Sequence, residues 1–360
     1  MDILKSLCSV PTAPFAEGQV VEFVREFVGR RKNLALRADR FGNLLIELKS
    51  SSRLPRWVFT AHMDHPGFVA KKMLDSRRLL ANFRGWVKVD FVRGTRVRFF
   101  DSAGEASGKV IEATVDKYDR LDVPHEVVVR VEREVEPKSP GMFDQGAGRY
   151  AGGKFFSRVC DDLGGAAACL EMIDRLSRGR LKSPVAVLLT RAEEEGFIGC
   201  IAVCEHRTLL RKTDRVIAIE CSSEQPAAPQ GKGVIIRVGD RASVFNSALT
   251  YFLGQQAEAL TKKDRKFRYQ RALMPGGVCE ATVYDVYGYT AASLCVALGN
   301  YHNMDIKRGK IGPEYIDVAD WRNMVKLFVR VAEHGHEFVP GHGALRARVL
   351  KRFRRLQGFL

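Results

Sequence analysis

The chain has 360 residues, of which 46% are hydrophobic and 28% are charged. This composition is that of an ordinary globular protein, so it excludes disordered, collagen-like, coiled-coil and small disulfide-stapled chains. At roughly 100–200 residues per domain, the length predicts two domains, or one large domain with an insertion. The net charge of +16 keeps open a hypothesis in which the chain binds nucleic acid or another acidic partner.

The first 18 residues lack the basic start and long apolar run of a signal peptide. Apolar stretches stay well below the ~20 residues that span a membrane, so we expect no membrane partner. The eight cysteines form no Cys-x-x-Cys pair, and several lie in apolar runs. Buried thiols of this kind are typical of a reducing compartment, so we expect a cytoplasmic protein.

Apolar periodicity predicts buried strands that alternate with helices along most of the chain. The predicted elements are a helix over 15–28, strands over 41–48 and 56–61, a helix over 163–177, strands over 184–190, 215–220 and 292–298, and a helix over 317–333. This alternation is typical of an α/β fold whose parallel-rich mixed sheet is flanked by helices.

Residues 70–150 have a different pattern. Short alternating strands are separated there by turns that contain Gly, Asp and Pro, and little of the segment has helical spacing. We therefore predict a small β-barrel-like domain at 70–150, inserted into a discontinuous α/β catalytic domain made of residues 1–69 and 151–360.

The last 16 residues combine basic and apolar side chains. The apolar ones recur at helical spacing: Leu345, Val349, Phe353, Leu356 and Leu360. We expect a helix that docks this stripe on the body of the protein and leaves its arginines in solvent. The alternative is a helix that binds a partner or nucleic acid, but no nucleic-acid-binding motif accompanies it, so we do not expect nucleic acid as a partner.

Candidate functional residues follow the predicted strands. They are His62 and Asp64 after the strand at 56–61, Asp161 and Asp162 before the helix at 163–177, Glu193, Glu194 and Glu195 after the strand at 184–190, Glu220 after the strand at 215–220, and Tyr301 and His302 after the strand at 292–298. Each alone has a structural explanation, such as a helix N-cap or a solvated helix start. The recurrence of five such clusters favours a ligand site, because ligands bind at the carboxyl ends of strands in α/β folds.

Histidines and carboxylates without thiolates suit a hydrolytic site with two divalent metal ions. Zn²⁺ is the expected ion, with Co²⁺ and Mn²⁺ as alternatives. Two such ions activate a shared water and polarise a carbonyl, and a further carboxylate transfers the proton. Neighbouring Glu193 and Glu194 could divide these roles, and Asp64 could orient His62.

The same segments resemble the dinuclear zinc aminopeptidases of the tetrahedral glutamyl/leucyl aminopeptidase family, some of which carry an endoglucanase label. The resemblance runs nearly end to end, through DRFGNLLIEL, TAHMDHPGFVA, RVCDDLGGAAACLEM, RAEEEGFIGC, VIAIECSS, GGVCEA and LGNYHNM. It implies that Asp161 bridges both metals, with His62 and Glu220 completing one site and Glu194 and His302 the other. It also implies that Glu193 is the general acid/base, with Asp64 behind His62.

Some positions depart from the family pattern. Leu163 stands where Arg is usual, Glu195 replaces Val after the glutamate pair, and Glu280 replaces Asp in GGVCEA. Glu220 is a longer carboxylate than the usual Asp. All five expected metal ligands and the base keep competent side chains, so an active enzyme is favoured.

Three functions follow from these observations. The first is an aminopeptidase that removes N-terminal residues from short peptides, in which a metal or Tyr301 stabilises the oxyanion. The resemblance implies a homo-oligomer as well, with a tetrahedral dodecamer, assembled through the inserted domain, as one form. The second is an N-acyl amino acid deacylase or carboxypeptidase-like amidohydrolase, and the third is a catalytically silent basic scaffold.

Overall fold

The computed structural model describes residues 2–118, 121–341 and 343–360. Within them, eleven strands form one mixed sheet. Its main path runs through β1 (Leu34–Ala38), β2 (Leu44–Leu48), β12 (Val185–Thr190), β3 (Trp57–His62), β13 (Arg215–Ser223), β16 (Thr290–Gly299), β19 (Glu314–Asp317), β11 (Lys154–Ser157) and β10 (Arg149–Ala151). The branch adds β14 (Val234–Gly239) and β15 (Tyr269–Leu273) beside β16.

The centre of this sheet is parallel. β12, β3, β13 and β16 pair in parallel, whereas β1, β2, β19, β11 and β10 pair with antiparallel neighbours. Every residue of β3 and β12 is buried, as expected for strands covered on both faces. The predicted parallel-rich α/β fold is therefore confirmed.

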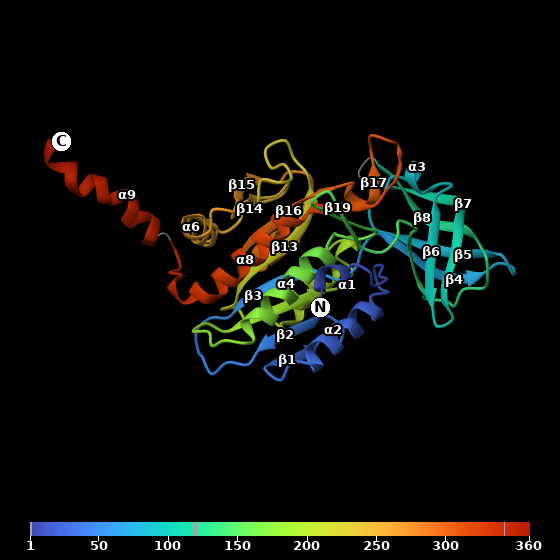
Figure 1. Cartoon of the computed structure of the whole chain (residues 1–360), viewed down its shortest axis with the longest axis horizontal. Helices are drawn as coiled ribbons and strands as arrows, with labels where there is room; N and C mark the ends of the chain where they lie inside the picture. Colours follow the sequence, from blue (N-terminus) through green and yellow to red (C-terminus); the bar gives the residue numbers. More distant parts are fainter. Residues whose placement is uncertain (1, 119–120, 342) are drawn as a thin grey trace.

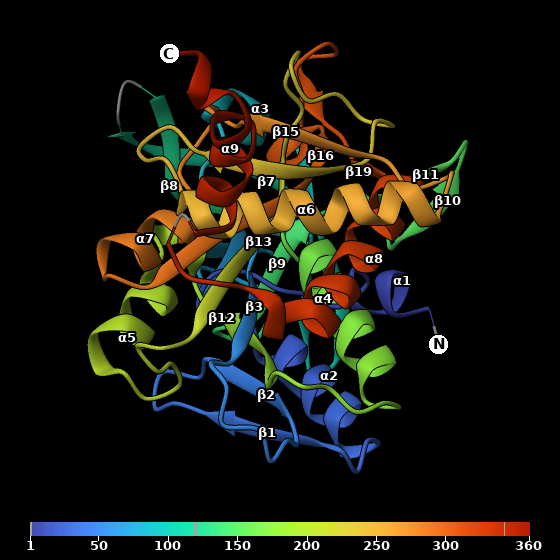
Figure 2. The ribbon, with the colours of Figure 1, turned by 90° about the vertical axis from the view of Figure 1, so that its left-hand side faces the viewer.

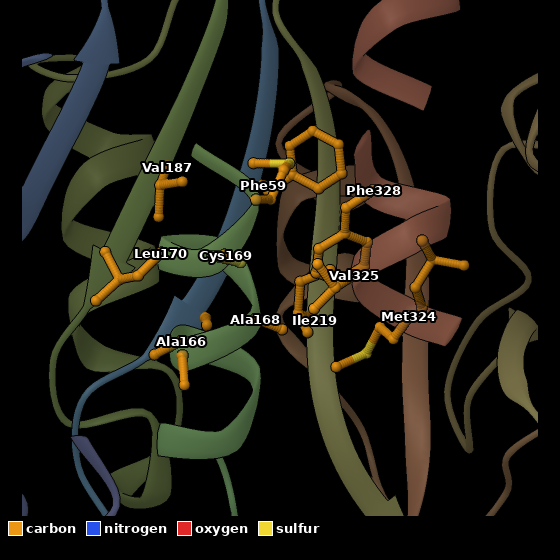
Figure 3. Close-up of a cluster of buried hydrophobic side chains, with 14 of the residues drawn as sticks. Phe59, Ala166, Ala168, Cys169, Leu170, Val187, Ile219, Met324, Val325 and Phe328 are labelled. Atoms are coloured by element: carbon orange, nitrogen blue, oxygen red, sulfur yellow. The ribbon is translucent and has the colours of Figure 1, made fainter. Parts of the chain in front are cut away.

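Helices cover both faces of the central strands (Figures 1 and 2). One face carries α1 (Ile3–Leu7), α2 (Gly18–Gly29), α4 (Leu163–Leu176), α6 (Ser247–Lys263) and α8 (Val318–His334), and the other carries α5 (Ile198–His206) and α7 (Glu280–Val286). In Figure 3, Val187 of the sheet lies near Leu170 of α4, and Ile219 of the sheet lies near Val325 and Phe328 of α8. The Phe59 and Phe328 rings lie 5.2 Å apart, so the core fixes the strands whose ends bear the candidate residues.

A closed antiparallel barrel forms the opposite end of the molecule from the C-terminus (Figure 1). Its strands are β4 (Gly67–Met73), β5 (Arg78–Arg84), β8 (Leu121–Val131), β7 (Gly104–Tyr118), β6 (Arg96–Asp101) and β9 (Pro140–Phe143). Its core is separate from that of the main sheet and contains Phe68, Phe99 and Phe143. The short elements α3 (Val89–Val92), β17 (Met304–Asp305) and β18 (Lys310–Ile311) lie nearby.

One helix and one strand begin a few residues later than the apolar pattern predicts. α2 begins at Gly18 because Phe15 has a φ of 67° and donates its N–H to the Glu17 carboxylate. β2 begins at Leu44 because the Asp39 carboxylate accepts the N–H groups of Phe41 and Asn43 and closes a turn. Local side-chain acceptors thus override the periodicity at both positions.

The expected docking of the C-terminal stripe is wrong. α9 (Gly343–Leu356) projects away from the body (Figure 1), and Val349 and Phe353 are 65% and 49% exposed. The main core ends at Phe338, which packs on Trp57 and Phe252, and the chain then turns outward. Among the residues that the structure describes, no helix is both long and apolar enough to cross a membrane.

Candidate metal centre

The predicted site residues meet at the carboxyl edge of the parallel strands. His62 ends β3, Glu220 lies in β13, and Asp161 comes directly before α4. The short 3-10 turns η1 (Glu193–Glu195) and η2 (Tyr301–Asn303) follow β12 and β16 and supply the remaining side chains. Adjacent parallel strands therefore bring together residues that lie as far as 240 positions apart in the sequence.

The candidate side chains form two groups, and within each group the potential ligand atoms lie within 4.8 Å of one another. One group is His62, Glu193 and Glu220, and the other is Asp161, Glu194 and His302. In the second group, His302 Nε2 lies 3.2 Å from Glu194 Oε1.

Asp161 belongs to the second group and also lies close to His62 of the first. Its Oδ1 is 3.6 Å from His62 Nε2 and its Oδ2 is 3.8 Å from His302 Nε2. The first of these distances is shorter than the 3.9 Å between His62 Nε2 and Glu193 Oε2. The geometry therefore allows Asp161 to serve both groups, while Glu193 also lies close to His62.

Several of these ligand atoms are buried without a partner. Within the described part of the chain, no hydrogen bond reaches Asp161 Oδ1, Glu194 Oε1, Glu220 Oε1 or His302 Nε2. Buried polar atoms are normally hydrogen-bonded, so unpaired atoms that converge on one space fit a site that binds a ligand. Nitrogen and oxygen donors of this kind fit divalent metal ions, with Zn²⁺ among them.

Burial and crowding shift the pKa values of three side chains in the cluster. Burial raises the pKa of Glu193 well above its usual range, and the neighbouring Glu220 and Glu194 add to this rise. Burial and Asp161 raise the pKa of Glu220 to about 8. Burial lowers the pKa of His302, but the charge of Glu194 outweighs it and the pKa rises to about 9. Loss of hydration and repulsion between carboxylates raise the pKa values of the two glutamates, and attraction to a carboxylate raises that of the histidine.

Asp64 connects the two glutamates to His62. Its carboxylate accepts the backbone N–H groups of Glu193 and Glu194 at 3.0 and 3.1 Å. His62 Nδ1 lies 3.2 Å from the Asp64 carbonyl and 3.5 Å from its carboxylate. The ring of His62 is therefore closer to the backbone carbonyl of Asp64 than to its carboxylate. The carboxylate mainly holds the η1 turn, which bears Glu193.

Sequence reasoning missed a second buried carboxylate, Glu314. It accepts the N–H groups of Cys160, Asp161 and His302 at 2.7, 3.1 and 2.8 Å. Glu314 thus joins the segments that carry two predicted ligands. It begins the short strand β19, behind a Gly-Pro pair, and no local pattern marks it as part of the site.

His65 was missed as well. Its Nδ1 lies 2.6 Å from the Asp161 carbonyl and its Nε2 lies 3.0 Å from Asn303 Oδ1. The amide of Asn303 is oriented because Nδ2 donates to the Arg158 and Gly312 carbonyls. His65 therefore supports the main chain at Asp161. Its position directly after His62-Met63-Asp64 was the only available signal.

A cavity of about 110 Å³ adjoins the candidate metal centre. Its lining includes Glu220, Ser222, Gln225, Arg237 and Tyr301. The Tyr301 ring stacks on that of His302 at 3.7 Å. Arg237 is buried, with Nη1 donating to Ser222 Oγ at 3.0 Å, and its Nε has no hydrogen-bond partner in the part of the chain that the structure describes. A buried guanidinium at this position could receive an anionic group.

The model of the M42 glutamyl aminopeptidase family matches residues 42–308, more than half of the chain. The chain belongs to this family. The resemblance predicted from the motifs is thereby confirmed, and the chain is a member of a metal-dependent peptidase family. A comparison with curated proteins found no match.

Solved structures share the fold at low sequence identity. The Pyrococcus horikoshii TET1 peptidase is 21% identical, with a TM-score of 0.74 over 92% of this chain and 98% of that one. A TET aminopeptidase from the archaeon Thaumarchaeota SCGC AB-539-E09 is 17% identical, with a TM-score of 0.76 over 92% and 96%. A Desulfurococcus kamchatkensis aminopeptidase is 19% identical, with a TM-score of 0.75 over 92% and 94%.

We expect the metal-free protein to bind Zn²⁺ more tightly as the pH rises from 6 to 9. The pKa values of about 8 for Glu220 and about 9 for His302 mean that protons occupy ligand atoms below these values. Each proton displaced increases the apparent affinity by about tenfold per pH unit until its group is deprotonated. Competition with a chromophoric chelator at several pH values measures this slope. An affinity that is flat after correction for the chelator would contradict it.

Proposed function

We propose that this chain is a dinuclear metallo-aminopeptidase that removes N-terminal residues from short peptides. The observation that carries the proposal is the pair of buried ligand groups on either side of Asp161. Family membership supports the peptidase activity. The proposed ligands are His62 and Glu220 at one site and Glu194 and His302 at the other.

Two divalent ions, most simply Zn²⁺ with Co²⁺ and Mn²⁺ as alternatives, would supply Lewis-acid polarisation and lower the pKa of a water. Glu193 then takes the proton of the attacking water and delivers it to the leaving amine. The pKa of Glu193, raised by burial, suits a carboxylate that must hold a proton between these steps. Asp64 keeps Glu193 in place through its backbone N–H.

Tyr301 would assist at the substrate carbonyl. Burial, together with the charge of Glu194, holds the pKa of its hydroxyl well above the usual range, so the group stays protonated and can donate a hydrogen bond. A neutral donor at this point would stabilise the developing oxyanion.

The cavity beside Glu220 favours peptide substrates whose N-terminal residue is acidic. Arg237 is always charged, and a guanidinium binds a carboxylate through paired N–H groups. Its Nε is buried and unpaired, so an N-terminal Glu or Asp side chain would satisfy it. The family description, glutamyl aminopeptidase, agrees with this preference.

We propose further that the chain is a cytoplasmic homo-oligomer and that residues 70–150 act in assembly or substrate access. All eight cysteines are free and buried, as expected in a reducing compartment. One related structure is a dodecamer, and another is of a peptidase that can assemble into a tetrahedron or a large octahedral shell. These forms support an oligomer for this chain.

The substitution Glu193→Gln should lower kcat by about 10²–10⁴-fold, because the amide cannot accept the proton of the water. Zinc content and thermal stability should stay near those of the unmodified protein, since Glu193 is not a required ligand. Hydrolysis of aminoacyl-nitroanilides measures kcat, and Glu126→Gln, on the barrel surface, serves as the control.

Two outcomes would contradict this assignment. Unchanged hydrolysis by the Glu193→Gln protein would remove the general acid/base role. If the unmodified protein rejects free-amine peptides and cleaves N-acylated ones, the deacylase alternative is correct instead. If it binds no zinc and cleaves neither class, a catalytically silent scaffold remains.

The substitution Arg237→Gln should lower kcat/KM for a glutamyl substrate by roughly 10–100-fold, as expected for loss of a charged hydrogen bond. Cleavage of a leucyl substrate should change far less. Arg271→Gln is the matched control, because Arg271 lies on the neighbouring strand β15 and is exposed. Equal losses for both substrates would show that Arg237 supports the fold and not the specificity.

A further inference from the structure

One segment of the barrel contacts the candidate metal centre from two sides. Directly after β5, Gly85 donates its N–H to Glu195 Oε1 at 2.8 Å, and Arg84 Nη1 lies 3.3 Å from Glu195 Oε2. The next carbonyl, that of Trp86, lies 2.6 Å from His302 Nδ1. Three consecutive barrel residues therefore reach both the η1 turn and a predicted metal ligand.

Both contacts reach the group that contains Glu194 and His302, and η1 also bears Glu193 of the other group. Glu195 adjoins Glu194 in η1, and Glu194 and His302 belong to one of the two groups that could hold a metal ion. His302 donates from Nδ1 to the Trp86 carbonyl, which leaves Nε2 unprotonated in the neutral ring and available as a ligand.

The local backbone fixes the direction of the Gly85 N–H. Gly85 has a φ of +89°, and a Cβ there would lie 2.9 Å from the Pro66 side chain. Only glycine fits such a position without strain. Glu195 and Arg84 are 24% and 28% exposed, so their ion pair adds little by itself. The bond from the Gly85 N–H is the main link.

We propose that Glu195 is a positioning residue that fastens the barrel to the η1 turn and so holds Glu194 and His302 at a fixed separation. This inference rests on the proposed function and deepens it, since it assigns the barrel a direct part in one metal site.

The test compares Glu195→Ala, Glu195→Gln and the control Glu126→Ala. Glu126 pairs with Lys71 on the barrel. For Glu195→Ala, we expect one of the two Zn²⁺ affinities to fall by about 10–100-fold, as for other groups that orient metal ligands, while the second stays unchanged. With peptide substrates, kcat should fall and KM should change little.

The Glu195→Gln protein should recover most of both losses, because its amide oxygen still accepts the Gly85 N–H. Hydrogen exchange in peptides that contain Gly85 should speed up in Glu195→Ala alone. The proposal is overturned if Glu195→Ala behaves like Glu126→Ala, if both zinc affinities fall together, or if Glu195→Gln fails to recover. Failure of the proposed function is recognised separately, because zinc titration and hydrogen exchange need no peptidase activity.

Discussion

The candidate site depends on a single electrostatic constraint, which is the burial of four carboxylates beside one another. Asp161, Glu193, Glu194 and Glu220 share this space with two histidines. Carboxylates this close repel one another and lose hydration, so they must bind protons or cations. The raised pKa values of Glu193 and Glu220 favour binding of protons. Two divalent ions, with a total charge of +4, would instead offset the four negative charges.

The surrounding structure holds these anions together through the main chain. Three further buried carboxylates accept backbone N–H groups in the segments that carry the ligands. Glu17 accepts from Ala192, Asp64 from Glu193 and Glu194, and Glu314 from Asp161 and His302. Left-handed backbone at Ala192, Asn300 and His302 turns the chain sharply at these strand ends. Strain of this kind persists where the surroundings fix it, as these carboxylates do.

The sequence predicts that most candidate ligands converge, because they follow buried strands and parallel strands align their carboxyl ends. His62, Glu220 and His302 need only that rule to meet, whereas Asp161 comes directly before α4. Glu314 and His65 were missed because their contribution is a contact with the main chain of a distant segment, which no spacing encodes. Docking of α9 was predicted from periodicity alone, and periodicity shows that a helix is amphipathic without showing what its apolar face meets.

The barrel illustrates the same limit at a larger scale. Its alternating strands are visible in the sequence, and the closed sheet follows from them. The contacts of Arg84, Gly85 and Trp86 with the metal centre depend on how the barrel sits against the main sheet. That placement is a tertiary property, and it makes a separately cored unit part of the site.

The most direct test is a crystal structure of the zinc-loaded protein with anomalous diffraction recorded at the zinc edge. The account predicts two ions per chain, about 3.5–4 Å apart as in other two-metal sites, with Asp161 between them. Asp161→Ala should lose both ions or retain only one. A single ion, or ions bound away from His62 and His302, would contradict the account.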